Sequence, residues 1–417
     1  MTQPDIEIRI AGERESAAWV NALRTAFLSP PVAPEDAAAW WRHRADPGRL
    51  LGAWEGDRCV GVLRGVPLEL TVPGGAALPA DGIAHIAVLS THRRRGILTR
   101  MLETGLARAR DRGDALAALC SSEHRIYGRF GFGHAARSSG LTIDVPRSGG
   151  LRPGIGQTPG RVDLADLADL AEIGPALHDR VRAARHGAVS RPPRHWLYAT
   201  GEAVDAGHTF TPPFVAVHRD PAGRATGVMT YRTQVRWSGG DPDGTLTVDD
   251  VLATGPGAAA ALWRHALQAD WVRTVTVRNL APDDPLPLWL RNPRAAEWTG
   301  DQAEDMWLRV LDAPRAFAAR TYDVPGRTVL DVADPQGHVA GRWLLDTAAD
   351  GTGALTPTTA DPDLALDASA LAALYLGGRT VPRLAAAGLV EELRPGAAAR
   401  AGLQLRTALA PWTPDMI

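Results

Sequence analysis

The chain has 417 residues, a mass of 44.3 kDa, a formal net charge of -2 and a pI near 6.6. This length predicts two or three domains, and the nearly neutral charge argues against a general nucleic-acid or membrane-surface binder. Two cysteines, Cys59 and Cys120, provide no disulfide framework and no metal site, and neither a signal-peptide pattern nor an apolar run of about 20 residues is visible, which predicts a soluble cytoplasmic protein.

The first third of the chain alternates patterns typical of helices and strands. Residues 83–121 read in the order strand, helix, strand, which predicts two parallel strands joined by a crossover helix. The predicted elements, from apolar periodicity and turn residues, are a helix at 14–28, strands at 50–54, 59–72 and 83–89, a helix beginning at 97 and a strand at 115–120.

Beyond this region, a stretch rich in Pro and Gly at 146–160 is predicted to be a linker. The patterns after it predict a second domain over 161–303 and a third over 304–417, so that the first domain covers 1–145. Their elements are a helix at 162–186, strands at 214–217, 227–237, 246–252 and 272–277, a helix at 258–271, an apolar start at 306–311, strands at 328–332 and 341–345, and helices at 368–376 and 381–387.

The most informative stretch is 85–99, HIAVLSTHRRRGILT, in which a β-branched strand leads to three arginines, Gly96 and a helical pattern. Such a corner directs free backbone N–H groups and the positive end of a helix at one point. The arginines add positive charge, and glycine allows a ligand close to the backbone. The pattern predicts a pyrophosphate site, although a solvated basic face or a patch for small anions or nucleic acid would also fit it.

With later motifs, the corner resembles the enhanced intracellular survival (Eis) acetyltransferases of the GCN5-related N-acetyltransferase (GNAT) superfamily. The acetyl-CoA loop pattern Arg/Gln-x-x-Gly-x-Gly/Ala falls on Arg93, Gly96 and Leu98, where leucine replaces the superfamily's small residue. The resemblance spans nearly the whole chain, with further matches at 122–123, 126–132, 284–287, 372–378, 384–387 and 411–412.

The resemblance implies an α+β fold class, with tandem GNAT domains followed by a sterol-carrier-protein-like α+β domain. The GNAT domains would have mixed, mostly antiparallel sheets with helices, and the second would be a degenerate copy without the cofactor corner. Family members assemble as hexamers, so the resemblance also implies a homohexamer.

The resemblance further implies how acetyl-CoA is held, without any metal. Backbone groups of one strand would pair with the pantetheine amides, and an N–H near Val88 would polarise the thioester carbonyl. The loop and helix start would wrap the pyrophosphate, and the neighbouring strand would end beside the cofactor. The cofactor-binding residues expected on this basis are Ile86, Ala87, Val88, Arg93, Arg94, Arg95, Gly96, Ile97, Leu98, Thr99, Ser122 and Glu123.

Two catalytic residues are expected from the resemblance. Tyr127 matches the family's proton donor, since a phenol with a pKa of about 10 can protonate a leaving thiolate. Its alternative role is that of a core tyrosine beside neighbouring phenylalanines. The general base would be the α-carboxylate of the last residue, Ile417, for which a frayed terminus is the alternative. Glu123 is the second candidate base, and Cys120 is expected to serve packing rather than nucleophilic attack.

The expected function is transfer of an acetyl group from acetyl-CoA directly to a primary amine, on an aminoglycoside-type or lysine-like small molecule or peptide. An early apolar loop that includes Phe27 favours smaller or more hydrophobic amines. Two functions of other classes remain open on sequence grounds: a non-catalytic GNAT scaffold, and a carrier of hydrophobic ligands in the last domain. Neither explains the cofactor corner.

Overall fold

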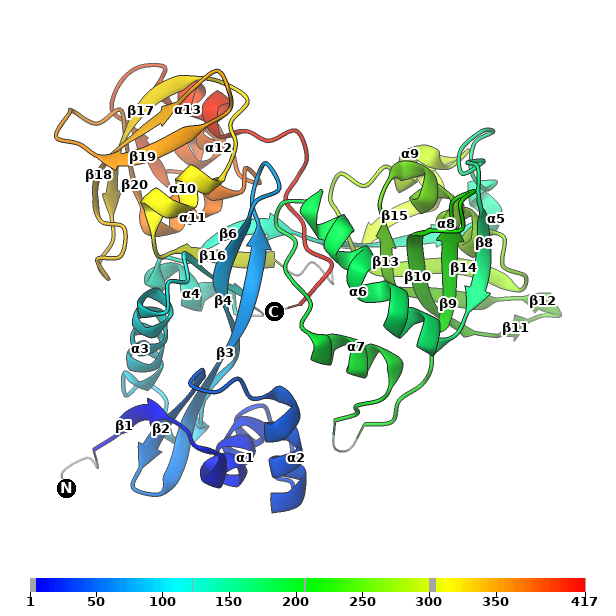
Figure 1. Ribbon diagram of the computed structural model, residues 1–417, viewed down its shortest axis with the longest axis horizontal. Helices are drawn as coiled ribbons and strands as arrows, with labels where there is room; N and C mark the ends of the chain where they lie inside the picture. The colour runs from blue at the N-terminus through cyan, green and yellow to red at the C-terminus, as the bar shows by residue number, and fades with distance from the viewer. Residues whose placement is uncertain (1–4, 122, 206–207, 300–304, 417) are drawn as a thin grey trace.

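The computed structural model of the chain describes residues 5–121, 123–205, 208–299 and 305–416. Within these ranges the strands form two seven-stranded sheets, one five-stranded sheet and a two-stranded hairpin. Each large sheet, with its helices, makes one lobe of the molecule (Figure 1). No helix in the described part of the chain is long and apolar enough to cross a membrane.

The first sheet is mixed, because all its neighbouring strands are antiparallel except one pair, β4 and β5. This pair and the helix between them confirm the predicted crossover unit. The strands lie in the order β1 (Glu7–Ile10), β2 (Leu50–Glu55), β3 (Arg58–Thr71), β4 (Ala77–Val88), β5 (Leu116–Cys120), β16 (Asp305–Val310) and β6 (Gly133–Arg137).

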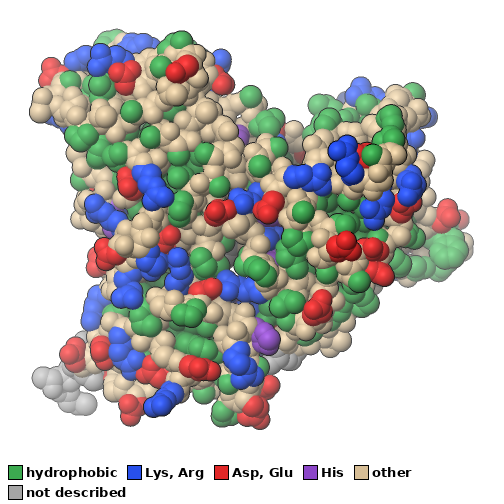
Figure 2. Space-filling view, viewed as in Figure 1, with side chains coloured by type: hydrophobic (Ala, Val, Ile, Leu, Met, Phe, Trp, Pro, Cys, Tyr) green, Lys and Arg blue, Asp and Glu red, His purple; other side chains and the backbone are tan. Residues whose placement is uncertain are grey.

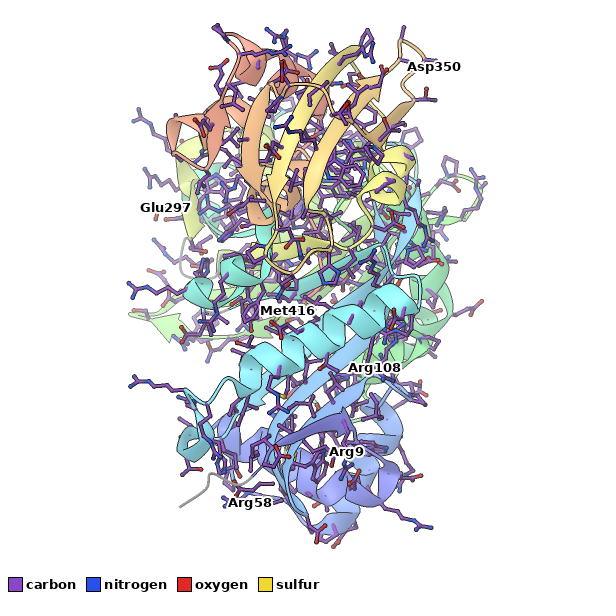
Figure 3. All side chains as sticks on the ribbon, turned by 90° about the vertical axis from the view of Figure 1, so that its left-hand side faces the viewer. Arg9, Arg58, Arg108, Glu297, Asp350 and Met416 are labelled. Carbon is purple, nitrogen blue, oxygen red and sulfur yellow. The ribbon has the colours of Figure 1, made fainter. Side chains whose placement is uncertain are left out.

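Helices cover both faces of this sheet. Because successive side chains of a strand point to opposite faces, the same strands present apolar residues to a helix layer on each side. Leu50 and Val62 pack with α1 (Ser16–Ala26) and α2 (Pro34–Arg44). Leu51 and Leu63 pack on the opposite face with α3 (Ile97–Asp111), which lies across the sheet (Figure 3). A short helix α4 (His124–Tyr127) and 3₁₀ turns η1 (Glu13–Glu15), η2 (Ser90–His92) and η3 (Gly128–Phe130) complete the lobe.

The second sheet repeats this plan. Its one parallel pair, β13 and β14, is also joined by a helix, α8 (Pro256–Leu267), and α6 (Leu167–Ala183) and α7 (Pro193–Thr200) pack on the other face. The strand order is β15 (Ala296–Thr299), β7 (Ser139–Asp144), β14 (Val272–Leu280), β13 (Gly244–Ala253), β10 (Ala225–Gln234), β9 (Phe214–Arg219) and β8 (Arg161–Ala165). The smaller elements are α5 (Val145–Ser148), α9 (Leu286–Trp289), η4 (Pro293–Ala295), β11 (Trp237–Ser238) and β12 (Asp241–Pro242).

The third lobe is packed against the first. Helix α11 (Ala368–Tyr375) lies on β6 and β16, and Ser369 Oγ donates to Phe132 O at 2.8 Å. Its sheet has the order β19 (Gly353–Pro357), β18 (Gly341–Thr347), β17 (Gly326–Ala333), β20 (Leu364–Asp367) and β21 (Val390–Glu392). Its helices are α10 (Ala313–Ala319), α11 (Ala368–Tyr375), α12 (Val381–Ala386) and α13 (Ala397–Leu405).

The lobes exchange strands across the expected domain boundaries. β7 precedes the predicted linker but belongs to the second sheet, and β16 follows residue 304 but lies between β5 and β6 of the first. The stretch 146–160 is docked on the second lobe, where Arg152 N donates to Trp289 O at 2.8 Å. The predicted helix start at 162 was wrong, because β8 pairs with β9 and the helix begins after the Asp166 cap.

Candidate active site

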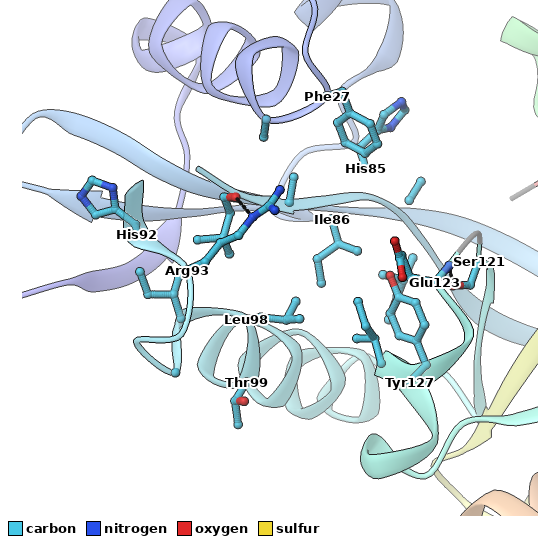
Figure 4. A pocket seen from close by; sticks show the side chains of 18 of the residues that line it. Phe27, His85, Ile86, His92, Arg93, Leu98, Thr99, Ser121, Glu123 and Tyr127 are labelled. Atoms are coloured by element: carbon cyan, nitrogen blue, oxygen red, sulfur yellow. Dashed lines mark hydrogen bonds between the residues drawn. The ribbon is translucent and has the colours of Figure 1, made fainter. Parts of the chain in front are cut away.

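A cavity opens in the first lobe where β4 and β5 separate. The ladder between these parallel strands runs from Ala80 to Gly82 of β4, and beyond it β4 continues alongside β3. The free edge of β4 borders a cavity of about 960 Å³, which is also lined by the end of α1, the start of α3 and α4 (Figure 4). This volume is at the upper end of the range for small-molecule sites, which leaves room for a large cofactor and a second substrate.

The edge of β4 is bent by a β-bulge at the cavity. His85 and Ile86 together oppose Leu63 of β3, and His85 has a positive φ of 49°. Such a conformation costs a non-glycine residue about 1 kcal/mol or more, and bulges redirect the backbone groups beside them. The His85 ring packs edge-on against Trp40 at 5.9 Å between centroids. Burial, with Arg64 nearby, lowers the pKa of His85 to about 4, so its imidazole is neutral at pH 7.

The predicted corner forms an uncapped helix start at the other end of the cavity. Gly96 has a positive φ of 73°, a conformation that favours glycine, and it stands at the N-cap of α3 with no side-chain cap. The residues of the first turn, Ile97, Leu98 and Thr99, line the cavity. The first N–H groups of a helix have no partner within it, and a pyrophosphate fits such a positive helix end.

The three arginines of the corner have different neighbours. Arg93 and Arg94 line the cavity, and Arg93 Nε donates to Val88 O at 3.4 Å. Arg95 is absent from the lining: its Nη1 lies 3.7 Å from Glu55 Oε1, which also lies 3.5 Å from His92 Nε2. The side chain of Arg95 thus ties the turn to the end of β2, whereas the other two are available to an anion.

Tyr127 places its ring in the core and its hydroxyl at the cavity. The residue is 7% exposed, and its ring packs edge-on against Phe132 at 6.1 Å between centroids. Among the described residues, none forms a hydrogen bond with its hydroxyl, which lies near Glu123 at the cavity wall (Figure 4). Burial, with the Glu123 charge, raises the pKa of Tyr127 above its ordinary value, so the phenol holds its proton at neutral pH.

Most residues expected at the site line this one cavity. They are Ile86, Ala87, Val88, Arg93, Arg94, Gly96, Ile97, Leu98, Thr99, Glu123 and Tyr127. Ser122 and Ile417 lie outside the described residues. Phe27 of the predicted apolar loop and Cys120, which was expected to serve packing, also line the cavity. Sequence analysis assigned no role to Arg129, a further lining residue, although it lies within the match at 126–132.

The comparisons with known proteins match three consecutive stretches of the chain. Residues 7–135 and 187–310 each match an acetyltransferase (GNAT) domain, and residues 313–414 match a sterol carrier protein domain. N-acetyltransferase Eis of Mycobacterium tuberculosis (strain ATCC 25177 / H37Ra) is 33% identical over 374 residues, 88% of each chain. The chain belongs to the Eis family of N-acetyltransferases. The predicted α+β fold of tandem GNAT domains and a sterol-carrier-like domain is thereby confirmed.

Two further relatives cover the full length of this Eis-family chain. An uncharacterized N-acetyltransferase of Streptomyces avermitilis is 44% identical over 100% of both chains. The crystal structure of Eis1 from Mycobacterium abscessus superposes with a TM-score of 0.85 and 33% identity, covering 99% of this chain and 100% of that one. The protein is therefore an acetyl-CoA-dependent acyltransferase of the GNAT type, and the scaffold and carrier alternatives are set aside.

Proposed function

We propose that this Eis-family enzyme transfers the acetyl group of acetyl-CoA directly to a primary amine, without an acyl-enzyme. One observation carries the proposal: a single cavity joins an uncapped helix start, suited to a pyrophosphate, to the hydroxyl of a tyrosine that keeps its proton. Acetyl-CoA requires a site for its pyrophosphate and, at its thioester, a proton for the leaving sulfur.

Within the cavity, the chain's groups divide the work. Arg93, Arg94 and the start of α3 bind the pyrophosphate, and the free edge of β4 pairs with the pantetheine amides. A backbone N–H near Val88 stabilises negative charge on the thioester oxygen. As the amine nitrogen bonds to the carbonyl carbon and the C–S bond breaks, Tyr127 donates its proton to the sulfur.

A base must take the proton that the amine loses, and we propose the α-carboxylate of Ile417, with Glu123 as second candidate. Deletion of Ile417, or a C-terminal tag, is expected to lower kcat by about 10²-fold or more, the usual contribution of a general base. The dissociation constant of coenzyme A, measured by calorimetry, should stay unchanged, because the cofactor groups lie elsewhere. Glu123→Gln is the matched variant. If Glu123→Gln lowers kcat and the enzyme without Ile417 is fully active, Glu123 is the general base.

The charge of the cavity bears on the acceptor. Among the described lining residues, Glu123 is the one carboxylate, whereas Arg93, Arg94 and Arg129 are cationic. A polycationic acceptor gains from several carboxylates at the cavity, which this lining does not offer. Phe27, 57% exposed, adds an apolar side chain to the lining beside His85 (Figure 4). Between aminoglycoside-type and lysine-like acceptors, we therefore propose smaller amines with an apolar body.

Rates of coenzyme A release over a panel of amines test this proposal. The panel contains aminoglycosides, polyamines, lysine peptides and phenylalkyl monoamines. We expect kcat/KM for a phenylalkyl monoamine to exceed that for a polyamine by about tenfold, since one lost ionic contact is worth roughly 1.4 kcal/mol. A preference for aminoglycosides would refute only the proposal on the acceptor. If none of the amines in the panel gave coenzyme A release, the proposed function itself would be refuted.

We also propose, from the family resemblance, that the enzyme works in the cytoplasm as a homohexamer. Basic, acidic and apolar side chains are interspersed over the face shown in Figure 2, so this face carries no broad patch of one charge. Light scattering of the purified protein would measure the mass of the assembly against that of the 44.3 kDa chain.

A further inference from the structure

The last described residues, 406–416, leave α13 and run back beside the second lobe (Figure 1). Trp412 Nε1 donates to Asn279 Oδ1 at 2.7 Å, and Trp412 N donates to His186 O at 3.1 Å. Asn279 Nδ2 in turn donates to Thr413 O at 3.1 Å. Segments without regular structure usually stay at the surface, yet Trp412 and Thr413 are buried. Specific contacts therefore hold this C-terminal segment in place.

The end of the segment is held by a buried ion pair. Arg191 Nε donates to Asp415 Oδ1 at 2.7 Å, and Arg191 Nη1 donates to Asp250 Oδ2 at 2.6 Å. The side chains of Arg191 and Asp415 are only 4% and 10% exposed. His178 Nε2 lies 3.5 Å from Asp415 Oδ2. We name Arg191, Asp250 and Asp415 the tail clamp.

The tail clamp keeps its charge. Burial favours the neutral form of Asp415, but Arg191 and His178 outweigh this and hold the pKa of the carboxyl below its usual value. A buried pair of this kind adds little net stability, but its geometry is well defined, because misplacing one charge leaves the other without a partner. The clamp is thus suited to fixing a position.

The position is set relative to the strand that supports the cavity. The residues before Arg191 run along β3, where Thr71 N donates to Ala188 O and Ser190 N donates to Glu69 O, both at 2.9 Å. β3 is also the strand that pairs with the cofactor edge of β4. The contacts at Glu69 and Thr71 lie where β3 pairs with Pro79 and Ala77 of β4, and the same two strands continue to the cavity edge, so β3 connects the chain before Arg191 with that edge.

Polar contacts continue from the clamp towards the bulge. Arg194, three residues after Arg191, donates from Nη1 to Asp46 Oδ1 at 2.8 Å. Asp46 Oδ2 lies 3.8 Å from Arg64 Nη2, and Arg64 pairs on β3 with Ala84, the neighbour of the bulged residues of β4. Three residues of chain and two ion pairs thus lead from Arg191 to Arg64, which lies on the strand paired with the bulged part of β4.

We infer that Arg191 is a positioning residue for acetyl transfer: through Asp415 it fixes the C-terminal segment two residues before Ile417. This inference rests on the proposed function, in which the α-carboxylate of Ile417 is the base. Displacing a reacting group by about 1 Å can cost 10²-fold in rate, so loss of the clamp should affect turnover more than binding.

Asp415→Asn is the first test, because Arg191 keeps Asp250 as a partner and no buried charge is left alone. We expect kcat, calculated per coenzyme A site, to fall at least tenfold, while KM for acetyl-CoA changes less than twofold. Asp415→Glu, which retains the charge, should recover most of the lost kcat. Asp363→Asn is the matched control, since Asp363 is a buried aspartate of the third lobe, 3.6 Å from Arg394 and without a role in the clamp.

Hydrogen exchange separates release of the segment from unfolding. In Asp415→Asn, the amide of Trp412 should exchange faster while the amides of α11 stay as protected as in the wild type. Faster exchange at Trp412 with wild-type kcat would overturn the inference, as would an Asp415→Glu variant as slow as Asp415→Asn. Because kcat is counted per cofactor site, a partly unfolded preparation does not obscure the result.

Deletion of Ile417 distinguishes this inference from the proposed function on which it rests. If the deletion lowers kcat and Asp415→Asn does not, the carboxylate is the base and the clamp does not position it. If neither change lowers kcat, the terminus has no part in catalysis. We expect both the deletion and Asp415→Asn to lower kcat, with KM for acetyl-CoA unchanged.

Discussion

Arg94→Glu is expected to abolish binding of coenzyme A at micromolar concentrations. The change replaces a cation that lines the cavity with an anion, next to the helix start where we place the pyrophosphate. Loss of a charge-assisted contact costs about 1.5–3 kcal/mol, and repulsion adds to it, so the dissociation constant should rise at least 10²-fold. Position 94 has a positive φ of 63°, and this conformation strains glutamate and arginine alike, so the fold should persist in the variant. Isothermal titration calorimetry measures the affinity.

Arg108→Glu provides the control for this change. Arg108 is exposed near the C-terminal end of the same helix, outside the cavity lining (Figure 3). The Arg108→Glu substitution changes the net charge by the same amount as Arg94→Glu, so any effect of overall charge on cofactor binding would appear in both variants. Unchanged titration heat for Arg94→Glu would remove Arg94 from the cofactor site, and equal loss in both variants would show that the effect is not local.

Tyr127→Phe is expected to lower kcat by about 10²–10³-fold, with the affinity for coenzyme A unchanged. The phenylalanine ring keeps the packing against Phe132, and the hydroxyl that is lost has no hydrogen-bond partner among the described residues, so the melting temperature should stay within a few degrees. What disappears is the proton for the leaving thiolate. Steady-state kinetics and thermal denaturation of the same preparation check both statements, and near-normal turnover would refute the role of Tyr127.

The pH profile provides a second check on Tyr127. In the proposed mechanism the active form is the protonated phenol, and the pKa of Tyr127 is raised by burial and by the charge of Glu123. Because the pKa of Tyr127 is raised above that of an ordinary phenol, its ionisation should cause no decline of kcat between pH 8 and about 9.5. A decline in that interval that vanishes in Tyr127→Phe would show that the phenol ionises earlier than the structure indicates.

The local parts of this fold could be predicted from the sequence. A helix period, a glycine at a left-handed position and a run of β-branched residues depend on neighbours a few positions away, so the corner around Gly96 and the parallel unit of β4, α3 and β5 were predicted correctly. The placement of β16 could not be predicted, because an apolar strand fits many sheet positions and its neighbours, β5 and β6, lie far away in sequence.

The sequence by itself determined the strand–turn–helix corner around Gly96, since the residues that form it are consecutive. Only the tertiary structure decided which arginines face the cavity: Arg94 lines it, whereas Arg95 lies beside Glu55 at the end of β2. The pairing of Arg191 with Asp415 was equally hidden, since 224 positions separate them. The physical reason is common to both: a contact between distant segments depends on how whole lobes pack, and no local pattern records it.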